Sequence, residues 1–156
     1  MRWTYLLTGF LFLTLLPARA GHSAPKVLLR VHIQTTGEGQ SELETSTIVL
    51  PPNNEKIQIR TLPELTEQEL VDVQPDASGA LHLQFNHVGQ VALSTVTAEN
   101  QGRILVVLIN GYVVYAPVID EQITSGELIL PHQVNPQLVQ ELQDVAKHNV
   151  REAAKN

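Results

Sequence analysis

The alternation of apolar and polar positions predicts most of the strands in this chain. Over residues 27–34, apolar side chains occupy every second position, which is typical of a half-buried strand. The segments 46–50 and 56–60 flank a Pro-Pro-Asn-Asn stretch that favours a turn, so they predict a hairpin. Similar patterns predict strands at 71–73, 81–85 and 128–130.

Capping residues mark where two helical segments begin. Thr66-Glu67-Gln68-Glu69 fits a capping box, in which the Thr hydroxyl and the Glu carboxylate each satisfy an unpaired backbone amide. This predicts a short helical turn before 71–73. Asn86 is the candidate cap of a longer helix over 87–98, which Gly102 ends. We expect this helix to bury Val88, Ala92, Leu93 and Val96.

The last helix is predicted from Asn135-Pro136. A cap residue stands there before a proline, whose missing amide proton costs nothing at the first helical position. Leu138, Leu142 and Val145 form its expected buried face. The polar segment from His148 onward is expected to fray.

The strongest local signal is the Asn110-Gly111 pair between two apolar runs. Residues 104–109 are apolar at every position, which predicts a strand covered on both faces. An Asn-Gly pair favours a two-residue type I′ hairpin turn, so 112–119 is the predicted return strand. Pro117 lacks an amide proton, which places that strand at an edge or makes it bulged near its end.

These elements predict one α+β domain. The expected sheet is largely antiparallel or mixed, with two main helices packed on one face. The length of 156 residues is close to the roughly 150 residues of one domain.

The first twenty residues have the pattern of a secretory signal peptide. Arg2 precedes a mostly apolar run over 3–16, and Ala18-Arg19-Ala20 has the small-x-small pattern that signal peptidase reads. A retained membrane anchor is the alternative, but the apolar run is shorter than the roughly 20 residues that cross a bilayer. We therefore expect an exported protein, periplasmic or extracellular, with no stable membrane span after cleavage.

Charge and composition exclude several classes of partner and site. The formal net charge of −6 becomes −8 when Arg2 and Arg19 leave with residues 1–20, so nucleic acid and anionic membranes would be repelled. The sequence has no Cys, which excludes disulfides, thiolate nucleophiles and Cys-based metal sites. After residue 20 the only aromatic residues are Phe85, Tyr112 and Tyr115, too few for a base-stacking surface.

The candidate catalytic residues form no recognisable constellation. His82 and His87 are five residues apart with no evident third ligand, which is typical of surface histidines. Asp120 and Glu121 are neighbours, and in an extended chain they point to opposite sides and form no dyad. We expect no enzyme activity, cofactor or metal. An enzyme would require His82 or His87 to meet carboxylates in a pocket.

An ordered motif covers residues 99–126. The sequence reads ENQGR at 99–103, ILVVLINGYVVYAPVID at 104–120 and ITSG at 123–126. This order resembles the periplasmic head subdomain of the SecD protein-export subunit. In that family a helix ends in Glu-Asn-x-Gly-Arg, a strand leads into an Asp-Gly or Asn-Gly hairpin, and the return strand ends in Ala-Pro-Val-Ile. The matching residues are Glu99, Asn100, Gly102, Arg103, Asn110, Gly111, Ala116, Pro117, Val118 and Ile119.

The resemblance extends over residues 62–142 and implies the fold of the SecD head. It also implies a soluble module that contacts polypeptide outside the membrane. SecD continues into six transmembrane helices that perform proton-coupled work, which this chain is not expected to carry out. We predict a signal peptide over 1–20, a head-like domain over 21–147 and a polar tail over 148–156.

Two interpretations of the motif residues remain open. In the first they serve the fold alone: turn geometry explains Asn110 and Gly111, a helix terminus explains Gly102, and an edge explains Pro117.

In the second interpretation the same region contacts a partner, with Tyr112, Tyr115 and Arg103 as candidates. Tyr112 and Tyr115 lie on opposite faces of one predicted strand, so the exposed one is the better candidate. Arg103 is alternatively a surface ion-pair partner of Glu99.

The leading functional hypothesis is non-catalytic binding of polypeptide or of an envelope protein, linked to protein export. An edge strand or an exposed sheet face would provide the contact. The alternative is a stand-alone structural or regulatory envelope module that keeps the fold without an export role.

Overall fold

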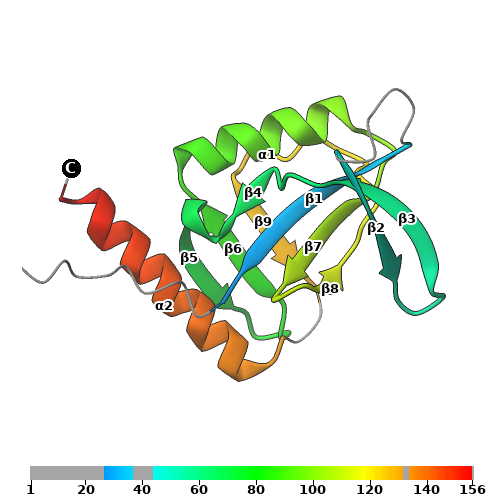
Figure 1. Ribbon diagram of the computed structural model, residues 1–156. Helices are drawn as coiled ribbons and strands as arrows, with labels where there is room; N and C mark the ends of the chain where they lie inside the picture. The colour runs from blue at the N-terminus through cyan, green and yellow to red at the C-terminus, as the bar shows by residue number, and fades with distance from the viewer. Residues whose placement is uncertain (1–26, 37–43, 132–133, 156) are drawn as a thin grey trace, which may run out of the picture.

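The computed structural model describes residues 27–36, 44–131 and 134–155 (Figure 1). The predicted signal peptide lies outside these residues. The strands are β1 (Leu29–Thr35), β2 (Thr45–Leu50), β3 (Glu55–Arg60), β4 (Leu65–Thr66), β5 (Leu70–Pro75), β6 (Leu81–Phe85), β7 (Leu105–Ile109), β8 (Tyr112–Tyr115) and β9 (Glu127–Leu130). The helical elements are η1 (Glu67–Glu69), α1 (His87–Glu99) and α2 (Pro136–Ala153).

The strands form two antiparallel sheets. The larger has the order β2-β3-β1-β7-β8, with β4 also paired to β1. The smaller has the order β5-β6-β9. Figure 1 shows α1 running across the top of the molecule and α2 lying beside β5. The predicted α+β class with antiparallel pairing is confirmed, and the strands divide between two sheets.

The main hydrophobic core joins both sheets and both helices. It includes the fully buried Leu29 of β1, Leu83 of β6, Leu93 of α1 and Leu142 of α2. A second cluster covers the opposite face of the larger sheet, where Val106 packs with Leu50, Ile57 and Ile59 of the β2–β3 hairpin. β7 is therefore covered on both faces, as predicted.

The polar face of β1 is more buried than the alternation indicates. His32 is only 6 % exposed, and its Nδ1 lies 2.8 Å from the carbonyl oxygen of Arg60 on β3. Burial lowers the pKa of His32, because the charged ring would lose its hydration. Sequence alternation described β1 as half buried, but it could not show that the β2–β3 hairpin folds over the second face.

The Asn110-Gly111 turn is confirmed, and the return strand is shorter than predicted. Asn110 and Gly111 have φ values of 51° and 84°, the two positive values that a type I′ turn requires. β8 ends at Tyr115, so a continuous strand over 112–119 is wrong. The register with β7 shifts between Val107 and Leu108, and after β8 an isolated bridge joins Ile104 to Val118. The predicted edge position and irregularity are confirmed.

Helix α1 begins where predicted but buries a different face. Asn86 Oδ1 accepts a hydrogen bond of 3.0 Å from Gly89 N. Val88 was expected in the core and is 69 % exposed, whereas Gly89 is buried. A Cβ atom on Gly89 would lie 2.8 Å from Phe85 Cβ and 2.9 Å from Glu69 Cβ. Gly89 therefore allows the close approach that turns Val88 to solvent.

Helix α2 extends further than predicted. Asn135 caps it by accepting a 2.9 Å hydrogen bond from Gln137 N, and Leu142 is fully buried. The expectation that the chain frays from His148 is wrong for residues 148–153, because the helix continues to Ala153. Asn149 Nδ2 donates to the carbonyl oxygens of Glu67 and Leu70 at 2.7 and 2.8 Å, which holds this last part of the helix against η1 and β5.

The predicted capping box is confirmed, and it places Glu67 inside the protein. Glu69 Oε2 accepts from Thr66 N at 2.8 Å, while Thr66 Oγ1 accepts from Gln68 N. Glu67 is 4 % exposed. Its Oε2 accepts a 3.2 Å hydrogen bond from Leu29 N and lies 3.7 Å from Arg30 Nη1. η1 is thereby joined to the start of β1.

Candidate functional site

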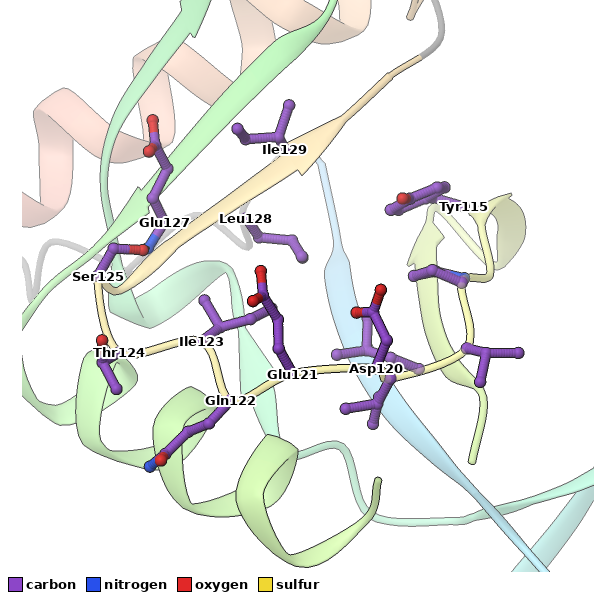
Figure 2. A pocket seen from close by; sticks show the side chains of 14 residues that line it. Tyr115, Asp120, Glu121, Gln122, Ile123, Thr124, Ser125, Glu127, Leu128 and Ile129 are labelled. Carbon is purple, nitrogen blue, oxygen red and sulfur yellow. The ribbon is translucent and has the colours of Figure 1, made fainter. Parts of the chain in front are cut away.

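A cleft of about 440 Å³ separates β8, at the end of the larger sheet, from β9, at the end of the smaller sheet. Figure 2 shows Tyr115 on one side, β9 on the other and the connecting segment 117–126 between them. Its apolar lining includes Leu105, Ile119, Ile123, Leu128 and Ile129. The cleft is therefore built mainly from the stretch that links β8 to β9, with Leu105 of β7 added to its lining.

The cleft runs along the free edge of β9. Successive side chains of a strand point to opposite faces of its sheet. The cleft nevertheless contacts three successive residues, Glu127, Leu128 and Ile129. A surface that reaches side chains from both faces of the sheet must follow the edge of the strand. Among the described strands β9 pairs only with β6, so its other edge carries no strand.

The motif at 99–103 and the segment 117–119 hold each other in place. Gly102 N donates to Ile119 O at 2.8 Å, and Ile119 N donates to Arg103 O at 2.8 Å. Leu105 N donates to Pro117 O at 2.9 Å. Gly102 has a φ of 80°, a value that glycine adopts without strain. These bonds fix the end of the cleft beside β8.

The other end of segment 117–126 is fixed to α1 and β6. Gln90 Nε2 donates to Thr124 O at 2.8 Å, and Phe85 N donates to Gly126 O at 2.9 Å. Gly126 has a φ of 72°, and a Cβ atom there would lie 2.8 Å from Gln90 Cβ. The corner that leads into β9 therefore depends on glycine.

Asp120 and Glu121 lie on the same side of their segment. Both are exposed and both line the cleft. Figure 2 shows their carboxylates directed into the space between β9 and Tyr115. The expectation that they point to opposite sides is wrong, because the chain bends at Glu121 and is not an extended strand there. Together with Glu127 they make the lining acidic.

His82 meets two carboxylates in a hollow on the outer face of the smaller sheet. Its Nδ1 lies 2.7 Å from Glu127 Oε1 and its Nε2 lies 3.4 Å from Asp76 Oδ2. The hollow, of about 440 Å³, is also lined by Asp72, Gln74 and Gln84. The expected surface position of His82 is confirmed, since its side chain is 30 % exposed, but its two carboxylate partners were not predicted. The partner Glu127 is 45 positions away in the sequence.

Hydrogen bonds shift the pKa of two groups in this hollow. The bond to Glu127, followed by the bond to Asp76, raises the pKa of His82 above its ordinary 6.5. Hydrogen bonds from Ser78 are the main cause that lowers the pKa of Asp76 to about 2. Ser78 Oγ donates to Asp76 Oδ1 at 2.6 Å. The two carboxylates therefore stabilise the protonated form of His82.

This geometry meets the stated condition for an enzyme, because His82 lies beside two carboxylates in a hollow. A general base needs a nitrogen that is free to take a proton from a substrate. Both ring nitrogens of His82 face carboxylates of the protein itself. Among the described residues, no three His, Asp or Glu side chains are grouped so as to hold a metal ion. The hollow has the character of a structural link between β6, β9 and the turn at Asp76.

The three predicted contact residues lie in different places. Tyr115 packs partly against the main core and lines the cleft. Tyr112 is 78 % exposed and lines a separate hollow of about 410 Å³ with Val49, Leu108 and Val113. Arg103 lines neither, and its Nη1 donates to Asn100 Oδ1 at 3.2 Å. Its partner is thus Asn100, whereas the alternative weighed above was an ion pair with Glu99.

The remaining motif residues are explained by local geometry. Asn100 is 4 % exposed, and its Nδ2 donates to Val96 O at 2.8 Å at the end of α1. Asn110 Oδ1 accepts a 2.9 Å hydrogen bond from Leu28 N, and Asn110 N donates to Leu28 O. Glu127 and Ile129, which line the cleft, were not predicted. Their short strand carries no polar motif that would single them out.

Comparison with known proteins agrees with the fold. Residues 40–147 match the model of the family described as SecDF, P1 head subdomain. A solved structure of SecDF, described as a membrane component that enhances protein export, has a TM-score of 0.56 and 22 % identity. The crystal structure of SecDF in a super-membrane-facing form has the same TM-score and 23 % identity. No curated protein matches the chain.

The similar region is part of larger structures. The matches cover 78 % of this chain, but only 62 % of the first solved chain and 18 % of the second. At 22 % and 23 % identity, the structural likeness shows that this chain shares the fold of the matched region. Within the described ranges, no helix has the length and apolar character to span a bilayer.

Proposed function

Because the chain belongs to the SecDF P1 head subdomain family, we propose that it is a non-catalytic polypeptide-binding protein linked to protein export. The observation that carries this proposal is the cleft along the free edge of β9. An extended polypeptide adds to such an edge through backbone hydrogen bonds, while neighbouring apolar side chains provide further contacts. The proposed location is the periplasm or the exterior of the cell.

Three features of the cleft support binding of an extended chain. The backbone groups of an edge strand that pair with no other strand are a template for one, although in β9 the Glu127 amide already donates to Ser125 Oγ at 3.1 Å. Ile129 and Val118 are 43 % and 58 % exposed, so apolar surface stands open beside this edge. Both ends of the segment 117–126 are fixed by the hydrogen bonds described above, which reduces the entropy lost when a partner binds.

A second candidate is a stand-alone structural or regulatory module without an export role. The bonds among Gly102, Arg103 and Ile119 favour it, because they account for the family motif within the fold itself. In this case the edge of β9 would serve one dedicated partner or none.

Site-specific photo-crosslinking in cells tests the proposal. A photoreactive residue at Ile129 reports on the cleft, and one at Val88, exposed on α1 outside the cleft lining, is the matched control. The proposal predicts that nascent secreted chains or translocon subunits are captured at position 129 and not at position 88. Capture of one dedicated protein at position 129, without secreted chains or translocon subunits, would favour the second candidate.

A further inference from the structure

The charge of the cleft has one sign. Of the described residues that line it, Asp120, Glu121 and Glu127 are acidic, and none is Lys, Arg or His. Asp120 and Glu121 are exposed and directed into the space between β9 and Tyr115 (Figure 2). Glu127 is different, since its Oε1 lies 2.7 Å from His82 Nδ1. The carboxylates available to a bound chain are therefore those of Asp120 and Glu121.

The acidic groups stand next to apolar surface along the same edge. The exposed side chain of Ile129 lies on β9, and Val118 lies near the opposite end of the segment that carries Asp120 and Glu121. An extended chain presents alternate side chains to opposite sides at about 3.3 Å per residue. A chain that pairs with β9 would therefore bring some of its side chains over apolar groups and others toward the carboxylates.

We infer that the cleft selects extended segments in which apolar residues are accompanied by Lys or Arg, and discriminates against acidic segments. This inference rests on the proposed function, because it specifies the chemistry of the polypeptide that the cleft would bind. Complementary charge at an interface mainly provides specificity and speeds association, and like charges oppose the wrong partner. Because Asp120 and Glu121 are exposed, salt screens their charges and weakens the preference for basic segments.

Three capped peptides of equal length and equal apolar pattern test the inference, with Lys, Gln or Glu at the polar positions. Their dissociation constants are measured by fluorescence anisotropy at low and at high salt. We expect the Lys peptide to bind about tenfold more tightly than the Glu peptide at low salt, with the Gln peptide between them. The ratio of the dissociation constants of the Glu and Lys peptides should fall to about twofold or less at high salt.

The double variant Asp120→Asn, Glu121→Gln tests whether the cleft is the cause. In this variant the dissociation constants of the Glu and Lys peptides should differ by about twofold or less at low salt. The matched control is Glu55→Gln, Asp144→Asn, which removes the same charge from exposed positions on β3 and α2. The control variant should prefer the Lys peptide over the Glu peptide as strongly as the unaltered protein does, because the overall charge is not the cause of this preference.

The outcomes separate this inference from the proposed function. Equal binding of all three peptides at low salt would overturn the inference and leave polypeptide binding intact. An equal loss of discrimination in the control variant would also overturn it, since the overall charge would then explain the preference. Binding of no peptide at either salt concentration would overturn the proposed function itself.

Discussion

His82 Nδ1 lies 2.7 Å from Glu127 Oε1, across the pairing of β6 with β9. In the register of these strands His82 is opposite Ile129 and Gln84 is opposite Glu127, so the two side chains are diagonal neighbours. Diagonal pairs on one face of an antiparallel sheet are within reach of long side chains. The bond therefore links the strand that forms one side of the cleft to the centre of its own sheet.

The first prediction concerns the pH dependence of this link. Because the folded protein raises the pKa of His82, its stabilising contribution is fully present below pH 6.5 and is lost as the pH rises through the folded pKa. His82→Gln should therefore lower the free energy of unfolding more at about pH 5.5 than at about pH 9. Urea denaturation at both pH values measures the difference.

The control for this prediction is His87→Gln, which alters an exposed histidine at the start of α1. His32 has a lowered pKa and acts with the opposite sign, but it is present in all three proteins and cancels from the comparison. Equal destabilisation by His82→Gln at the two pH values would contradict the proposed link.

The second prediction concerns the buried carboxylate of Glu67. Glu67→Ala removes the acceptor for Leu29 N and the ion-pair partner of Arg30. The buried amide would be left without its partner, so we expect a loss of about 1–3 kcal/mol in the free energy of unfolding. Glu67→Gln, which keeps a side-chain oxygen, should cost less. Glu55→Gln, at an exposed position of β3, is the control, and a similar loss there would contradict this role for Glu67.

The third prediction compares two neighbouring residues of α1. Gly→Ala within a helix usually stabilises by about 0.5–1 kcal/mol. Gly89→Ala should instead destabilise by about 1–3 kcal/mol, because its Cβ would collide with Phe85 and Glu69. Val88→Ala should change stability by less than about 0.5 kcal/mol, because Val88 is 69 % exposed. Thermal or urea denaturation showing the reverse order would mean that α1 presents the other face to the core.

The fourth prediction separates two roles of Asn110. Its side chain accepts a hydrogen bond from Leu28 N, and its backbone has a φ of 51°. Asn110→Gly keeps the turn conformation but loses the hydrogen bond, so the free energy of unfolding should fall by about 0.5–1.5 kcal/mol. Asn110→Ala also strains the backbone and should cost about 1 kcal/mol more. Equal stability of the two variants in urea denaturation would contradict a backbone role at this position.

Features that depend on neighbours in the sequence could be predicted. The caps at Thr66, Asn86 and Asn135 and the turn at Asn110-Gly111 each involve hydrogen bonds or dihedral angles within a few residues. Their residue types therefore carry the information. The same holds for the strand alternation that placed Leu81, Leu83 and Phe85 in the core.

Features that depend on distant segments could not be predicted. The cleft exists because two sheets end opposite each other and because Gly102, Arg103 and Leu105 bond to residues 117–119. The position of Val88 depends on how closely Gly89 approaches Phe85, and the link of His82 depends on a strand 45 positions away. None of these relations leaves a local pattern in the sequence.

Residue-resolved amide hydrogen exchange tests the central claim most directly, namely that the edge of β9 binds an extended polypeptide. The measurement compares the free protein with the protein saturated by a capped peptide in which Lys alternates with apolar residues. We predict slower exchange for amides of β9 and of the segment 117–123, with β2, at the far end of the larger sheet, unchanged. Peptide binding that leaves β9 exchange unaltered, or that protects β2 instead, would contradict the account.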